Sequence, residues 1–216
     1  IEGMSIGDSA LDYFNKKEIR KNKRNWFKDK EYSHSEFRNL QKIKLYEDIH
    51  LNYLSNDKKF IIVAIEGVTF YRNKINKCLK KMNEIDSEFK NLFRNTVRGG
   101  IEKNKHSDSS IPGKNYVTDI IYDFNNGDRI VLACYDWSKE SGYGDHLRIS
   151  LRSNKFIYFL DNKAYNWLTA GLIIPRSHSF NCFSFNLLQP SLNLDTHKTQ
   201  WESVYYEEII TYSYLN

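Results

Sequence analysis

The chain has 216 residues, of which 40% are hydrophobic and 27% are charged, and its 32 Lys and Arg against 27 Asp and Glu give a formal net charge of +5. A chain of this length can bury a substantial core without metals or disulfides. The composition excludes a chain that is disordered throughout, a collagen-like chain and a small disulfide scaffold. Because no run of about 18 apolar residues occurs, we expect no transmembrane segment.

The N-terminal region predicts two short helices and carries most of the excess positive charge. Asp8 or Ser9 can cap a first helix through residues 10–14, and a second helix is predicted at about 17–24. Between residues 16 and 30 the chain has eight basic and two acidic residues, interleaved with Trp26 and Phe27. The charge is therefore concentrated on one short segment.

This basic run is a candidate surface for an anionic partner. Positive charge with interleaved aromatic rings is typical of surfaces that bind nucleic acid or an anionic membrane. The alternative is a solvated face whose two aromatic side chains pack inward. The patch that would bind such a partner consists of Lys16, Lys17, Arg20, Lys21, Lys23, Arg24 and Trp26.

The middle of the chain predicts a β-hairpin followed by one long helix. Residues 42–54 alternate between apolar and polar side chains, which is a strand pattern, and 59–71 predict the partner strand after a turn at 55–57. From 73 to 95 apolar side chains recur at spacings of three and four, which predicts an amphipathic helix. This stripe consists of Ile75, Cys78, Leu79, Met82, Ile85, Phe89, Leu92 and Phe93.

The following segments predict a second set of strands. Residues 99–114 form a loop by composition, strands are predicted at 115–124, 129–137 and 146–152, and 154–165 predict a closing helix. Segregated hairpins of this kind indicate an α+β fold, in which an antiparallel sheet of β-hairpins packs on the long amphipathic helix, with short N-terminal helices and a closing helix. We expect residues 1–165 to form this single domain and residues 166–216 to be a C-terminal extension.

The three cysteines do not form a metal-binding pattern. Cys78, Cys134 and Cys182 occur in no CxxC or CxxH spacing, so zinc has no support from this pattern, and we expect neither a metal nor a cofactor. Cys78 and Cys134 are the better pair for a disulfide, because each lies on the apolar face of a predicted element. Two separate buried thiols are the alternative.

One loop concentrates candidate acid–base groups. Asp136, Glu140, Asp145 and His146 lie in and beside the loop between two predicted strands, where they could hold a metal or act as a general acid and base. The alternative is a solvated hairpin loop, since the spacing matches no diagnostic motif. The Ser-rich loop around His106 and Asp108 also lacks the Gly-x-Ser-x-Gly motif of a hydrolase nucleophile.

Four segments resemble a family of small exported proteins from marine alphaproteobacteria that has no assigned activity. They are residues 1–14, 56–71, the helix around 78–82, and 133–151, so the resemblance covers roughly residues 1–165. Members carry one cysteine on a central helix and one before a Tyr-Asp pair, which correspond to Cys78 and Cys134. The resemblance therefore implies a periplasmic or secreted protein with a Cys78–Cys134 disulfide. The loop 105–114 and the extension 166–216 depart from the family.

We expect a non-enzymatic binding or envelope-accessory module. Its partner would be an envelope component or another anionic surface, and with export we expect no nucleic acid. The alternative is a small hydrolase that uses the loop from Asp136 to His146. The two differ in their demands, because an enzyme needs convergent titratable groups in a cleft, whereas a binding module needs only an exposed apolar or charged patch.

Overall fold

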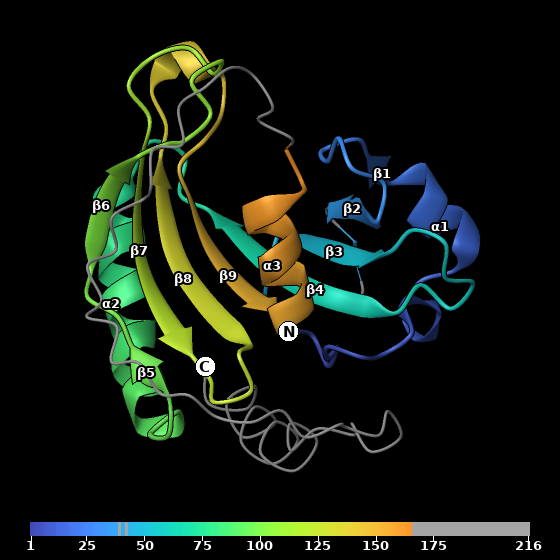
Figure 1. Cartoon of the computed structure of the whole chain (residues 1–216). Coiled ribbons are helices and arrows are strands. Elements are labelled where there is room, and N and C mark those ends of the chain that lie inside the picture. Colours follow the sequence, from blue (N-terminus) through green and yellow to red (C-terminus); the bar gives the residue numbers. More distant parts are fainter. Residues whose placement is uncertain (39, 42, 166–216) are drawn as a thin grey trace. The chain divides into compact units, whose positions relative to one another are not determined.

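The computed structural model describes residues 1–38, 40, 41 and 43–165. Within these residues nine strands form one antiparallel sheet in the order β1-β2-β3-β4-β9-β8-β7-β5, and β6 pairs with β7 beside β5 (Figure 1). The strands are β1 (Lys23–Arg24), β2 (Tyr32–Arg38), β3 (Asp48–Leu54), β4 (Ile62–Phe70), β5 (Val97–Arg98), β6 (Glu102–Lys105), β7 (Tyr116–Asp123), β8 (Arg129–Asp136) and β9 (His146–Arg152). The predicted α+β class with an antiparallel sheet is confirmed.

The helical elements are short, apart from α2. They are the 3-10 turns η1 (Ala10–Asp12) and η2 (Lys139–Ser141), and the helices α1 (Lys16–Lys21), α2 (Ile75–Leu92) and α3 (Asn154–Asn162). No helix in the described ranges is long and apolar enough to cross a lipid bilayer. The predicted extension 166–216, which contains Cys182, lies outside the described residues.

The two predicted sets of strands join into one sheet through β9. The hairpin β7–β8 closes as expected, with Gly127 at φ 83° and its N–H donating to the Phe124 carbonyl oxygen. β9 pairs with β8 on one side and with β4 on the other. The sheet therefore runs without interruption from the basic N-terminal segment to the C-terminal half of the domain.

Alternation along the strands gives the sheet one apolar face and one polar face. On β8, Ile130, Leu132 and Cys134 point to the face on which α2 packs. The other face receives Val131 and Ala133 from β8, but β2, β3, β4 and β9 contribute to it the buried polar side chains of His34, Glu36, His50, Glu66 and Ser150. Buried polar groups cost free energy unless they are paired, so the polar face is the unusual feature of the fold.

Helix α2 is present where it was predicted but buries little of its apolar stripe. Only Cys78, Met82 and Asp86 are buried, and the remaining apolar members of the stripe are partly exposed. The expectation that the sheet packs on one long amphipathic stripe is therefore too strong. Cys78 and Cys134 lie at disulfide distance, with Sγ atoms 2.01 Å and Cα atoms 6.0 Å apart, as the resemblance implies.

Helix α3 covers part of the polar face. Ser153 caps it by accepting from the Phe156 N–H, and Phe156 and Phe159 pack with Phe27 and Ala64 in an apolar cluster. Ala64 and Glu66 are two residues apart on β4, so their side chains point to the same face. The apolar cluster therefore lies on the face that carries the buried charges. α2 and α3 thus lie on opposite faces of the sheet (Figure 1).

The sequence did not predict four of the strands. In β2 six consecutive residues are buried on both faces although most are polar, so apolar–polar alternation is absent. β6 is an exposed edge of charged and amide side chains inside the segment predicted as a loop. β1 and β5 have two residues each, which is too short to give a periodic pattern.

We predict that Gly67→Ala destabilises the protein by about 1–3 kcal/mol, the usual cost of overpacking. A Cβ atom at Gly67 would lie 2.5 Å from two ring carbons of Tyr46, whereas at Gly100 it would meet nothing within 4 Å. Gly100→Ala is therefore the matched control and should leave the urea midpoint nearly unchanged. Equal midpoints for the two variants would show that the Tyr46 ring yields without cost.

Candidate functional site

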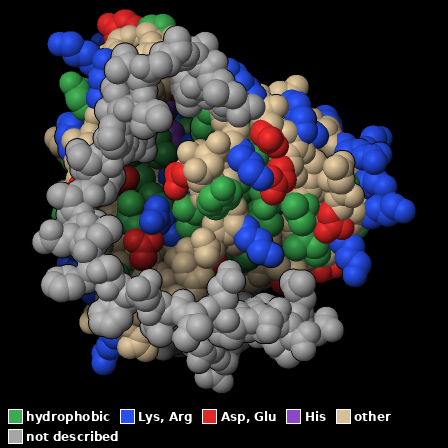
Figure 2. Space-filling view, viewed as in Figure 1, with side chains coloured by type: hydrophobic (Ala, Val, Ile, Leu, Met, Phe, Trp, Pro, Cys, Tyr) green, Lys and Arg blue, Asp and Glu red, His purple; other side chains and the backbone are tan. Residues whose placement is uncertain are grey.

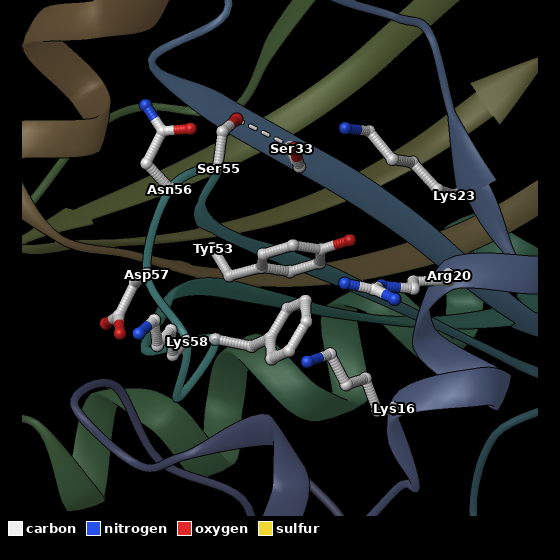
Figure 3. Close-up of a pocket in the computed structure, with 10 residues that line it drawn as sticks. Lys16, Arg20, Lys23, Ser33, Tyr53, Ser55, Asn56, Asp57 and Lys58 are labelled. Atoms are coloured by element: carbon white, nitrogen blue, oxygen red, sulfur yellow. Dashed lines mark hydrogen bonds between the residues drawn. The ribbon is translucent and has the colours of Figure 1, made fainter.

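A basic pocket of about 210 Å³ opens where α1, β1 and the β3–β4 turn meet. Its rim carries four cationic side chains and one carboxylate. Figure 3 shows the side-chain nitrogens of Lys16, Arg20 and Lys23 directed toward Tyr53 and Ser33. The pocket is lined by Lys16, Arg20, Lys23, Ser33, Tyr53, Ser55, Asn56, Asp57, Lys58 and Phe60.

Local structure on α1 places two of the cations together. A capping box fixes the start of the helix, since the Asn15 side chain accepts from the Glu18 N–H and the Glu18 carboxylate accepts from the Asn15 N–H. Ile19 is fully buried and anchors the helix to the sheet. Lys16 and Arg20 are four residues apart and therefore share one face of the helix. Figure 2 shows Lys and Arg side chains gathered at this end of the molecule.

The inner wall of the pocket combines hydroxyl groups with two buried aromatic rings. Ser33 and Ser55 share a hydrogen bond of 2.7 Å, and the Tyr53 and Phe60 ring centroids are 5.3 Å apart. Phe60 has φ 52°, a left-handed conformation that a bulky residue adopts only at a cost. Strain of this kind is typical of functional sites.

The cations of the pocket are not neutralised by neighbouring carboxylates. Among the described residues, Lys16, Arg20, Lys23 and Lys58 make no ion pair within 4.0 Å. Asp57 Oδ1 accepts the backbone N–H of Lys59. The pocket therefore keeps a positive field and can hold an anion.

The structure divides the predicted basic patch among three environments. Lys16, Arg20 and Lys23 line the pocket, whereas Lys17 and Lys21 are exposed away from it. Arg24 and Trp26 belong to the other face of the sheet. The patch is thus not the single surface that the sequence suggested.

Strand alternation explains why consecutive basic residues separate. Lys23 lies opposite Ser35 on β2 and Arg24 lies opposite His34, so their side chains point to opposite faces. Arg24 pairs with Glu36 at 3.3 Å, and the Trp26 indole stacks on His34 with ring centroids 4.8 Å apart. Both residues therefore serve the polar face and not the pocket.

The candidate acid–base loop does not bring its four residues together. Asp136 lies 3.7 Å from Lys103, Glu140 is exposed, and Asp145 accepts the backbone N–H of Trp137. Burial and the nearby Arg148 lower the pKa of His146 to about 3, so its imidazole is neutral. Within the described residues no hydrogen bond or ion pair joins any two of the four.

The polar face contains the second cluster of titratable groups. The His34 imidazole, 3.6 Å away, lowers the pKa of Glu36 to about 2, and burial lowers the pKa of His50. Although burial opposes ionisation, Arg148 holds the pKa of Glu66 well below its usual value. The polar face, part of which α3 covers, therefore holds a network of ionised carboxylates and histidines.

Sequence reasoning missed most of the pocket wall and all of this buried cluster. Ser33 and His34 lie on β2, whose polar sequence gave no strand signal. His34-x-Glu36 is a spacing that places two side chains on one face of a strand, but this signal becomes visible only once β2 is assigned.

Comparison with known proteins gives no family assignment. No family model, no curated protein and no solved structure matches the chain. The resemblance to exported alphaproteobacterial proteins therefore stays a prediction.

Proposed function

We propose that this protein is an exported, non-enzymatic binding module that holds the phosphate group of an envelope component in the basic pocket. The observation that carries the proposal is the set of four cationic side chains around a hydroxyl-lined pocket without ion-pair partners among the described residues. Lys and Arg side chains bind phosphate oxygens through charge-assisted hydrogen bonds. Ser hydroxyls supply further donors.

The size of the pocket favours a small anionic headgroup. Drug-sized ligands occupy roughly 300–1,000 Å³, and the pocket measures about 210 Å³. The buried rings of Tyr53 and Phe60 pack against each other and offer no free face to a nucleobase. Single-stranded nucleic acid is bound mainly through such stacking, so a phosphate headgroup suits the pocket better.

Two further observations support a binding function in an exported protein. Cysteines at disulfide distance are typical of oxidising compartments. The loop from Asp136 to His146, on which the hydrolase alternative depends, lacks the convergence of titratable groups that catalysis needs. The binding function therefore rests on better geometry than the alternative.

We predict that the double variant Arg20→Ala/Lys23→Ala weakens phosphate binding at least about tenfold, because each hydrogen bond to a charged group contributes about 1.5–3 kcal/mol. Lys17→Ala/Lys21→Ala removes the same charge from exposed positions outside the pocket and is the matched control. Binding is measured by calorimetry with inorganic phosphate and by co-sedimentation with phosphatidylglycerol vesicles.

The two ligands separate the possible sources of the phosphate group. Binding of both supports recognition of the group itself, and binding of vesicles alone supports recognition of a membrane-borne headgroup. Equal losses in the two double variants would mean that general surface charge is responsible, and that result would overturn the pocket as the site.

A further inference from the structure

Three metal-ligand side chains converge on the polar face, on the opposite side of the sheet from the basic pocket. His34 and Glu36 are two residues apart on β2, and His50 lies opposite Glu36 on β3. One potential ligand atom from each residue lies within 4.8 Å of the other two, and all three residues are buried. In the part of the chain that the structure describes, no other three His, Cys, Asp or Glu side chains meet in this way.

The hydrogen bonding of His34 leaves an unusual contact. Its Nδ1 lies 2.9 Å from Asn52 Oδ1, an acceptor, so Nδ1 carries the proton and donates. A neutral ring then has its lone pair on Nε2, which lies 3.6 Å from Glu36 Oε1 and makes no hydrogen bond to any described residue. Unless Nε2 carries a proton, two electron-rich atoms face each other, an arrangement that a metal ion between them would stabilise.

His50 repeats this pattern on the neighbouring strand. Its Nδ1 lies 3.5 Å from a carboxylate oxygen of Glu66, and both its ring nitrogens are buried without a hydrogen-bond partner among the described residues. An oxygen acceptor behind each imidazole is the usual second shell of a metal-bound histidine, because it fixes the tautomer and orients the ring. Asn52 provides this support for His34, and the Glu66 carboxylate lies in the corresponding place behind His50 at 3.5 Å.

Glu36 is held so that one oxygen remains on the histidine side. Its Oε2 lies 3.3 Å from both Arg24 Nε and Arg38 Nη2. The two arginine side chains are 43% and 59% exposed, whereas that of Glu36 is 5% exposed. The arginines thus anchor the carboxylate from the solvent side and leave Oε1 facing His34.

We propose that His34, Glu36 and His50 bind one divalent first-row transition-metal ion through their two imidazoles and the carboxylate. Two histidines and one carboxylate form the donor set of mononuclear sites that keep open coordination positions. Metal–donor bonds of about 2.0–2.2 Å place donor atoms roughly 3–3.6 Å apart. The ligand atoms of His34 and Glu36 already have this spacing. The widest distance between two of the three ligand atoms, within 4.8 Å, must shorten by about 1 Å, which side-chain rotation provides.

Trp26 covers this site and offers a spectroscopic reporter. Its indole stacks on His34 at 4.8 Å and meets the His50 ring edge-on at 6.5 Å between centroids. With 46% of Trp26 exposed, the ring lies between the two imidazoles and solvent. A bound paramagnetic ion would therefore quench Trp26 fluorescence.

The test uses the full-length, oxidised protein after removal of metals with a chelator. Calorimetric titration with Zn²⁺ should show one ion per chain, and Co²⁺ should give visible d–d absorption and quench tryptophan fluorescence. Glu36→Gln and His50→Ala should each weaken Zn²⁺ binding more than the 10–100-fold typical of second-shell changes. Asn52→Ala, which removes the positioning group behind His34, should fall within that range.

His146→Ala is the matched control, because His146 is another buried histidine on the same face but lies outside the cluster. It should leave Zn²⁺ affinity unchanged, and circular dichroism checks that each variant is folded. Trp26→Phe should abolish most of the quenching but keep the heat of Zn²⁺ binding. Unchanged affinity in folded Glu36→Gln would overturn the proposal. If the folded wild-type protein bound neither Zn²⁺ nor Co²⁺, the proposal would also be overturned. A protonated His34 would then be the cation that faces Glu36.

Discussion

Reduction of the Cys78–Cys134 disulfide is expected to lower the free energy of unfolding by about 4 kcal/mol. The two cysteines are 56 residues apart in the sequence. In the chain-entropy description, a cross-link over a loop of that length removes about this much conformational freedom from the unfolded chain. The bond also ties α2 to β8 on the apolar face, where α2 otherwise buries only Met82 and Asp86.

The measurement compares urea unfolding of the oxidised protein with that of Cys78→Ser/Cys134→Ser. Both proteins should carry Cys182→Ser, so that a third thiol cannot exchange with the bond. A difference below about 1 kcal/mol, far under the loop-closure value, would contradict a stabilising disulfide and would weaken the inference of an oxidising compartment.

Asp86→Ala is expected to destabilise the protein by about 3 kcal/mol or more, the cost of breaking a buried ion pair from one side. Asp86 is 4% exposed, and its carboxylate accepts hydrogen bonds from Nε and Nη2 of Arg98 at 2.7 and 2.9 Å. Lys90 Nζ at 2.9 Å and the Tyr122 hydroxyl at 2.6 Å complete the set. The substitution would remove the acceptor of Arg98 Nε and Nη2 and would leave the buried Tyr122 hydroxyl with only the backbone carbonyl oxygen of residue 86, at 3.1 Å.

A more exposed aspartate–arginine pair, joined by a single contact, provides the control. Arg129 Nε lies 2.6 Å from Asp123 Oδ1, but both side chains are substantially exposed. Exposed ion pairs contribute about 0–1 kcal/mol, so Asp123→Ala should cost little. Similar losses in the two variants would show that burial does not set the strength of the Asp86 network.

The Asp86 contribution should also depend on pH in a defined direction. Although burial opposes ionisation, the hydrogen bonds from Arg98, Tyr122 and Lys90 hold the pKa of Asp86 below its usual value of 3.8. A carboxylate with a lowered folded pKa stabilises the folded state at pH values above its unfolded pKa and loses this effect as the pH falls through the folded pKa. The stability difference between wild type and Asp86→Asn should therefore be constant near neutral pH and shrink below about pH 4.

Elements with strong periodicity could be predicted from the sequence, and elements defined by pairing could not. The alternation in β3, β8 and β9 reflects one buried apolar face, so these strands were recognised, and β4 was recognised from its β-branched and aromatic residues after a turn. β2 lies between two strands with buried polar side chains on one face, which removes the alternation signal. A single sheet could not be foreseen, because β9 pairs with β4 across a long sequence separation.

The candidate sites show the same division between local and long-range information. Residues 16–23 could be selected by charge alone, but Lys58, Ser33 and Phe60 join them only through the packing of β2, β3 and the following turn. His34, Glu36 and His50 meet because β2 and β3 pair in one particular register. A shift of that register by one residue would send His50 to the opposite face.

The central claim, an anion held in the basic pocket, is tested most directly by two-dimensional NMR of the labelled protein titrated with inorganic phosphate. We predict saturable shifts of the backbone amides of residues 16–23 and 53–60, which surround the pocket, and their loss in Arg20→Ala/Lys23→Ala. Shifts confined to the loop at 136–146, or no saturable shifts at any residue, would contradict the account.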